Sequence, residues 1–263
     1  MIPSFVGEGT PAAVTSGTVQ PTNPSSLLVD DILVGWMGSG TSGTAFGVPA
    51  GWAIEDETLT INARGAWAWR RVAAAGESDD VIDFTQSGNT QQFYAGIFAL
   101  RGCETSGNPF DSTQNNTCTS CDVATMAAVT TTGVNRKLIH ISFVEDNRSA
   151  QDNAANYTLQ YSGVTTVGSD AAYGVYFQDA ATAQLYAADS AGHDGFGNNE
   201  HHVEFTIDFK EPGVAGWAGK INGVASPAKI NGVAIANISK VSGVSGLYLP
   251  DEKKIIYPYR KAA

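Results

Sequence analysis

The chain has 263 residues, of which 43% are hydrophobic and only 16% are charged, and its formal net charge is -11. So many hydrophobic residues exclude a wholly disordered chain. The acidic balance argues against sequence-independent binding to nucleic acid, which needs a basic surface. No stretch approaches the roughly 18 apolar residues that cross a bilayer. We therefore expect one large domain, or one domain plus an appendage, with neither nucleic acid nor membrane as its partner.

The first 25 residues are rich in Pro, Gly and Thr. We expect residues 1–25 to form an extended N-terminal arm that needs a partner strand to become ordered. The same stretch has no basic region followed by an apolar one, so no secretory signal is expected and synthesis in the cytoplasm is the default.

Short apolar runs separated by turn residues follow, which is the pattern of β-strands. The predicted strands lie at 33–37, 65–72, 81–85, 93–100, 137–144, 157–161, 173–177 and 202–209. Between them, residues 103–122 contain almost no apolar side chain and are predicted to form a polar loop. Long helical patterns are scarce, so the fold class is mostly β.

The clearest alternation in the chain is residues 202–209, His-Val-Glu-Phe-Thr-Ile-Asp-Phe. Apolar side chains at every second position give this strand one dry face and one wet face, as in an antiparallel β-sandwich. We therefore predict a jelly-roll-like antiparallel β-sandwich over residues 26–211.

The last segment, residues 212–263, repeats one short pattern. Lys-Ile-Asn-Gly-Val occurs at 220–224 and 229–233, and Lys-Val-Ser-Gly-Val at 240–244. Asn-Gly between β-branched residues is a strong signal for a two-residue hairpin. Hairpins this short need a surface to pack on, so the segment is predicted to be an assembly element rather than an independent domain. The alternative is a linker that merely tolerates hairpins. The residues predicted to make assembly contacts are Trp217, Lys220, Ile221, Val224, Lys229, Ile230, Val233, Lys240, Val241, Val244, Tyr248 and Arg260.

Charge is divided unevenly along the chain. Residues 212–263 hold seven basic and two acidic side chains, and the remaining 211 residues hold eight basic and 24 acidic ones. An acidic body with a basic tail favours docking of the tail on an acidic surface, in the same chain or in a neighbour.

Several further motifs extend over the body: Asp-Ile-Leu-Val-Gly (31–35), Pro-Ala-Gly-Trp (49–52), Leu-Arg-Gly (100–102) and Phe-Thr-Ile-Asp-Phe-Lys-Glu (205–211). Together with the repeats at 220–244 and the following Leu-Tyr-Leu (247–249), they resemble structural proteins of tailed-bacteriophage virions. The resemblance implies a virion protein without catalytic residues or cofactors. Its partners would be copies of itself, as a homo-oligomer for which a trimer is one option, and other virion proteins.

Three cysteines offer a candidate site. Cys118 and Cys121 have CxxC spacing, and Cys103 lies in the same polar stretch. Three thiolates with a fourth ligand would suit zinc, but no second CxxC or histidine pair follows. The other options are a disulfide from Cys103 to Cys118 or Cys121, or free thiols.

Other polar clusters favour a solvated surface over a site. His193-Asp194 and Glu200-His201-His202 are not expected to converge on one ion, because vicinal residues of a strand point to opposite faces. The carboxylates at 55–57 and 79–80 are predicted to be turn residues rather than a glycosidase pair. Trp36, Trp52, Trp67 and Trp69 are predicted to be core residues, with a sugar-binding platform as the alternative.

These patterns together predict a non-enzymatic structural component of a virion, placed in the tail, baseplate or fibre. The alternatives, in descending order, are a capsid decoration protein, a host-attachment module that binds a surface glycan, and an envelope-degrading hydrolase.

Overall fold

The computed structural model describes residues 1–40, 44–88, 92–121, 123–145, 149–165, 167, 171–192 and 201–212, together with four short strands beyond them. The chain divides into two units, Met1–Glu211 and Pro212–Ala263. The first unit is all-β, since its described residues contain strands and no helix, and every paired strand is antiparallel. The mostly-β prediction is confirmed.

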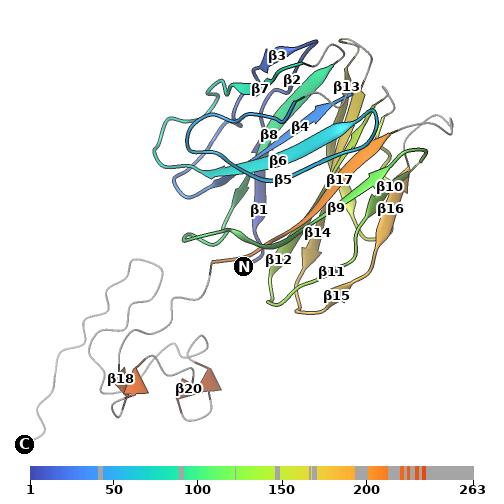
Figure 1. Ribbon diagram of the computed structural model, residues 1–263. Coiled ribbons are helices and arrows are strands. Elements are labelled where there is room, and N and C mark those ends of the chain that lie inside the picture. The colour runs from blue at the N-terminus through green and yellow to red at the C-terminus, as the bar shows by residue number, and fades with distance from the viewer. Residues whose placement is uncertain are drawn as a thin grey trace, which may run out of the picture. The chain divides into compact units, whose positions relative to one another are not determined.

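Two sheets make up most of the first unit (Figure 1). The first sheet has the order β1-β8-β4-β6-β5, with β2 also paired to β8. Its strands are β1 (Ser4–Glu8), β2 (Ala12–Val14), β4 (Ile32–Ser39), β5 (Ala53–Leu59), β6 (Arg64–Arg71) and β8 (Phe93–Arg101). The second sheet has the order β13-β14-β12-β17-β9. Its strands are β9 (Phe110–Cys118), β12 (Arg136–Val144), β13 (Thr158–Thr165), β14 (Ala171–Ala180) and β17 (His202–Phe209).

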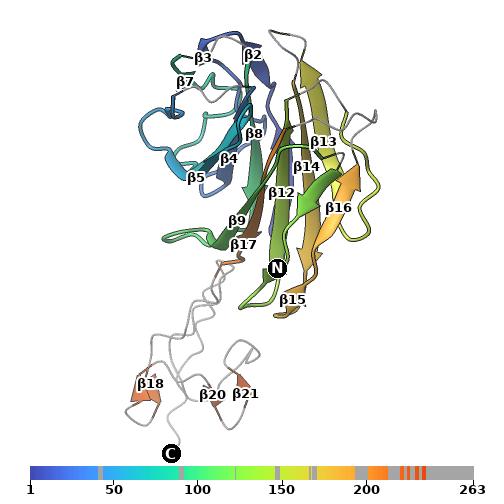
Figure 2. The same ribbon diagram turned by 45° about the vertical axis from the view of Figure 1, so that its right-hand side comes forward.

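Both sheets are covered on both faces. The largest core cluster takes its buried side chains from the two sheets together, which face each other in Figure 2. A second cluster lies on the other face of the first sheet, under β3 (Gly17–Val19), β7 (Phe84–Gln86) and the loops beside them. A third lies on the other face of the second sheet, under β10 (Val123–Met126), β11 (Val129–Thr130), β15 (Leu185–Tyr186) and β16 (Asp189–Gly192). This double covering explains why β4, β8 and β17 are buried along almost their whole length.

The two halves of the body repeat one topology. Each sheet takes five long strands from one half of the chain. If the five are numbered by their place in the chain, the order across the sheet is first, fifth, second, fourth, third, starting from β1 in the first sheet and from β9 in the second. The small pairs correspond as well: β3 pairs with β7 in the first half, and β11 pairs with β15 in the second. We call Met1–Arg101 the first module and Phe110–Phe209 the second module.

Local details repeat at a constant spacing. Phe5 pairs with the fifth strand of its module and Phe110 does the same in the other, and in both a β-bulge follows at the next residue. Asp30 and Asn135, with φ of 72° and 55°, each stand just before the second long strand. The residue numbers in both pairs differ by 105. The repeat therefore extends to irregularities that strand order alone does not require.

Residues 1–25, predicted to be an arm in need of a partner strand, find their partners within the same chain. β1 and β2 pair with β8, and β3 pairs with β7. The polar stretch 103–122 is not simply a loop, and here the prediction is wrong. It contains β9, whose side chains are mostly polar because β9 is an edge strand of the second sheet.

Candidate functional site

The C-terminal unit holds two described hairpins. β18 (Lys220–Ile221) pairs with β19 (Val224–Ala225), and β20 (Lys229–Ile230) pairs with β21 (Val233–Ala234). In each hairpin only Asn and Gly separate the paired strands, which is the connection that a two-residue turn needs.

Six of the twelve predicted assembly residues lie on these strands: Lys220, Ile221, Val224, Lys229, Ile230 and Val233. The other six lie outside the described residues: Trp217, Lys240, Val241, Val244, Tyr248 and Arg260.

The three cysteines match the predicted options only in part: Cys103 is free, as one option had it, but the disulfide joins a different pair from the one predicted. Cys118 and Cys121 form a disulfide with each other at the end of β9, and Cys103 is a free, buried thiol. Burial raises the pKa of Cys103 to about 12, so the thiol stays protonated and unreactive at neutral pH. The predicted link from Cys103 to either partner is wrong, because Cys103 is buried in the core cluster between the sheets. Within the described ranges, no group of three or more His, Cys, Asp and Glu side chains is placed to hold a metal ion.

The polar face of β17 is buried, not wet. His202, Glu204, Thr206 and Asp208 have at most 1% of their surface exposed. The prediction of a solvated face fails because the β10–β16 pair lies over this side of the sheet, where the Thr125 amide donates to Glu204 at 2.9 Å. His193, Asp194 and Glu200 of the same predicted cluster lie outside the described residues.

Two groups of this buried polar face have shifted pKa values. Burial raises the pKa of Asp208 to about 6, against the opposing effect of Arg136 and Lys210. Neither oxygen of its carboxylate has a hydrogen-bond partner among the described residues. Burial lowers the pKa of His140 to about 4, and its Nδ1 lies 3.1 Å from the Thr206 hydroxyl. Since these groups lie within the interior, they bear on stability more directly than on chemistry with a substrate.

The carboxylates of residues 55–57 lie in β5. The prediction that they are turn residues is wrong. Each binds a different group. Glu55 accepts a hydrogen bond from Trp69 Nε1 at 2.7 Å. Asp56 accepts one from Asn115 Nδ2 at 3.0 Å, and Glu57 pairs with Arg64 at 2.6 Å. They stabilise the edge of the first sheet and do not form a paired acid and base.

The tryptophans predicted to be in the core are buried there. Trp36 and Trp67 are almost fully covered, Trp69 is half-buried against the same cluster, and Trp52 is 8% exposed. Trp36 stacks on Tyr173 of the opposite sheet, with ring centroids 4.1 Å apart. Trp36, Trp52 and Trp67 are too well covered to offer the open ring face that stacking on a sugar requires.

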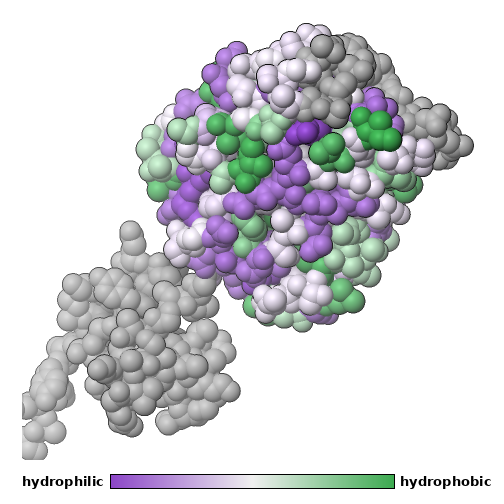
Figure 3. All heavy atoms as spheres, viewed as in Figure 1, coloured by the Kyte–Doolittle hydropathy of each residue, from purple (hydrophilic) through white to green (hydrophobic). Residues whose placement is uncertain are grey.

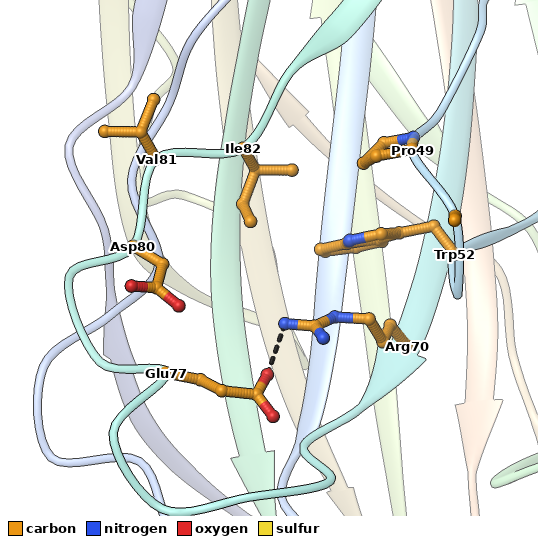
Figure 4. A pocket seen from close by; sticks show the side chains of 8 residues that line it. Pro49, Trp52, Arg70, Glu77, Asp80, Val81 and Ile82 are labelled. Carbon is orange, nitrogen blue, oxygen red and sulfur yellow. Dashed lines mark hydrogen bonds and ion pairs between the residues drawn. The ribbon is translucent and has the colours of Figure 1, made fainter.

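One pocket of about 300 Å³ opens beside Trp52 (Figure 4). Its lining comes from the 49–52 turn, from Arg70 of β6 and from the 77–82 segment. Figure 4 shows Trp52 between Pro49 and Arg70, and the Arg70 guanidinium carbon lies 5.7 Å from the Trp52 ring centroid. Sequence reasoning singled out the 49–52 motif and the carboxylates at 79–80 separately. It missed their contact because 25 or more residues separate them along the chain.

The described residues contain no helix long and apolar enough to span a membrane. Comparison of the chain with protein-family models, with curated proteins and with solved structures found no match.

Proposed function

We propose that this protein is a structural component of a tailed-phage virion, placed in the tail, baseplate or fibre, and that it acts by assembly through its C-terminal segment. A body of the jelly-roll-like β-sandwich class belongs to the same proposal. The observation that carries it is the separate unit 212–263, which is basic in charge and holds two described hairpins of two residues per strand. Pairs this short do not hold together alone in water.

We expect the body to fold without the segment. All three core clusters of the described residues consist of residues of the first unit. On this expectation the segment can make contacts with other chains.

The edges of the body also favour assembly through the segment. The four outer strands are β1 and β5 in the first sheet, and β9 and β13 in the second. Each has a register shift in its pairing with its neighbour. Bulges on edge strands oppose edge-to-edge addition of another strand. Assembly by extending these sheets is thus disfavoured.

Neither does the side of the body in Figure 3 present one dominant apolar area. Among the coloured residues there, hydrophobic groups are small and separated by hydrophilic ones. An acidic body and a basic segment instead favour contacts between unlike charges.

The test compares the full chain with a chain ending at Pro212, using light scattering coupled to size-exclusion chromatography. We expect the full chain to form a defined oligomer. The shortened chain should keep its thermal unfolding transition but have a smaller mass. If both have the same mass, the segment is not the assembly element and the proposal fails.

A further inference from the structure

The pocket beside Trp52 has an apolar wall and an acidic rim. Val81, which is 57% exposed, and the half-buried Ile82 line one side. Carboxylates occupy four of the seven positions from 77 to 83, and Arg70 is the only cation among the described residues that line the pocket. The local charge is therefore negative around a patch of exposed hydrocarbon.

The two carboxylates that line the pocket differ in how they are engaged. Glu77 forms an ion pair with Arg70 and accepts hydrogen bonds from the amides of Ala73 and Ala74 at 3.0 and 2.9 Å. Asp80 is exposed, and its carboxylate has no hydrogen bond or ion pair with any residue in the described part of the chain. Asp80 is thus free to bind a cation from outside.

Lysine fits this chemistry. Its four-carbon stem covers apolar surface while the ammonium group reaches a carboxylate. The basic segment 212–263 carries six lysines and one arginine, and a lysine begins each described hairpin, at Lys220 and Lys229.

We propose that the Trp52 pocket of one copy binds a hairpin lysine, Lys220 or Lys229, from the C-terminal segment of a second copy. This inference rests on the proposed function and names the surface that the segment binds. The lysine stem would lie against Val81 and Ile82, and its ammonium group would pair with Asp80.

The experiment measures self-association of the full chain by sedimentation velocity at low salt, where exposed ion pairs are strongest. Asp80→Asn removes the free carboxylate. Asp79→Asn is the matched control, because it makes the same change at the adjacent exposed residue, which does not line the pocket. Asp79 has a φ of 62°, which asparagine also tolerates.

We expect Asp80→Asn to weaken each association step by about two- to five-fold, as for loss of one exposed ion pair, and Asp79→Asn to change it by less than two-fold. Asp80→Lys should weaken association further because it places like charges together. Combining Asp80→Lys with Lys220→Asp and Lys229→Asp should recover part of the loss, since the pairs are then reversed and not removed.

The failures are distinguishable. If the chain ending at Pro212 loses assembly but Asp80→Asn behaves like Asp79→Asn, the proposed function stands and the pocket is not the docking surface. If the full chain is monomeric, both proposals fall.

Discussion

Replacing Asp208 with asparagine should make the protein more stable at neutral pH. Asp208 is fully buried in β17, and its carboxylate has no hydrogen-bond partner within the part of the chain that the structure describes. Burial raises its pKa from 3.8 to about 6. The folded state therefore favours the protonated acid. The contribution of this group to stability is fully present below about pH 4 and is lost as the pH rises through 6.

The size of the effect follows from the pKa difference. At 1.36 kcal/mol per pKa unit, ionised Asp208 costs about 3 kcal/mol once the pH is well above 6. Asparagine cannot ionise, so Asp208→Asn removes this cost, although its amide is also buried without a partner and costs about 1–3 kcal/mol at every pH. The pH dependence is the clearer measure. The difference in unfolding free energy, variant minus natural protein, should rise by about 2–3 kcal/mol between pH 4 and pH 8.

The assay is urea unfolding followed by tryptophan fluorescence at several pH values from 4 to 8. Asp179→Asn is the control, because Asp179 is an exposed carboxylate of the same sheet that pairs with Lys137. Its loss should change stability by no more than about 1 kcal/mol. An Asp208→Asn difference that stays constant from pH 4 to pH 8 would refute the reasoning, since it would mean that Asp208 titrates alike in the folded and unfolded chains.

Three further results are expected. His140→Gln should show the opposite pH dependence. Burial lowers the pKa of His140 from 6.5 to about 4, so the natural protein loses stability as the pH falls through this range. In the same urea series, the unfolding free energy of the variant should therefore rise by about 3 kcal/mol relative to that of the natural protein between pH 7 and pH 4. Thiol titration should find no reactive thiol in the folded protein, one after unfolding without reductant, and three after unfolding with reductant. The reason is that Cys103 is buried and the other two cysteines are joined in a disulfide. A reactive thiol in the folded protein would contradict the burial of Cys103. Gly38→Ala should destabilise the protein by about 1–3 kcal/mol in thermal unfolding, because the added Cβ would lie 1.9 Å from Cδ2 of Phe143. Gly7→Ala is the control: the nearest atom to its added Cβ is 3.9 Å away, so the change should cost less than 1 kcal/mol.

The main strands were predictable from the sequence because they combine β-branched and aromatic residues with clear boundaries. The predicted strand 202–209 has the same bounds as β17, and 93–100 differs from β8 by one residue. β9 was missed because an edge strand needs few apolar side chains, so Asp111 to Thr117 read as loop residues. Residues 81–85 were predicted as a strand, but pairing with β3 begins only at Phe84.

The buried polar face was beyond sequence reasoning for a different reason. Alternation shows that two faces of a strand differ, but it does not show what covers the polar one. Here β10 and β16 come from residues more than 60 positions apart and meet only in the folded chain. The Trp52 pocket has the same origin, since the 49–52 turn and the 77–82 segment meet through long-range packing.

The repeated topology shows that the buried polar face is a property of this sequence and not of the fold. In the second module Leu138 pairs with Asp208, and in the first module Leu33 pairs with Ala99 at the equivalent register. Four residues further along the second strand of each module, Ser142 pairs with Glu204 in the second module and Met37 pairs with Ala95 in the first. The first module thus builds the same sheet with an apolar outer face, which costs no desolvation of charge. Because the topology tolerates apolar residues at these positions, the polar groups of the second module are not needed to form the sheet, and their replacement should leave the strand order intact.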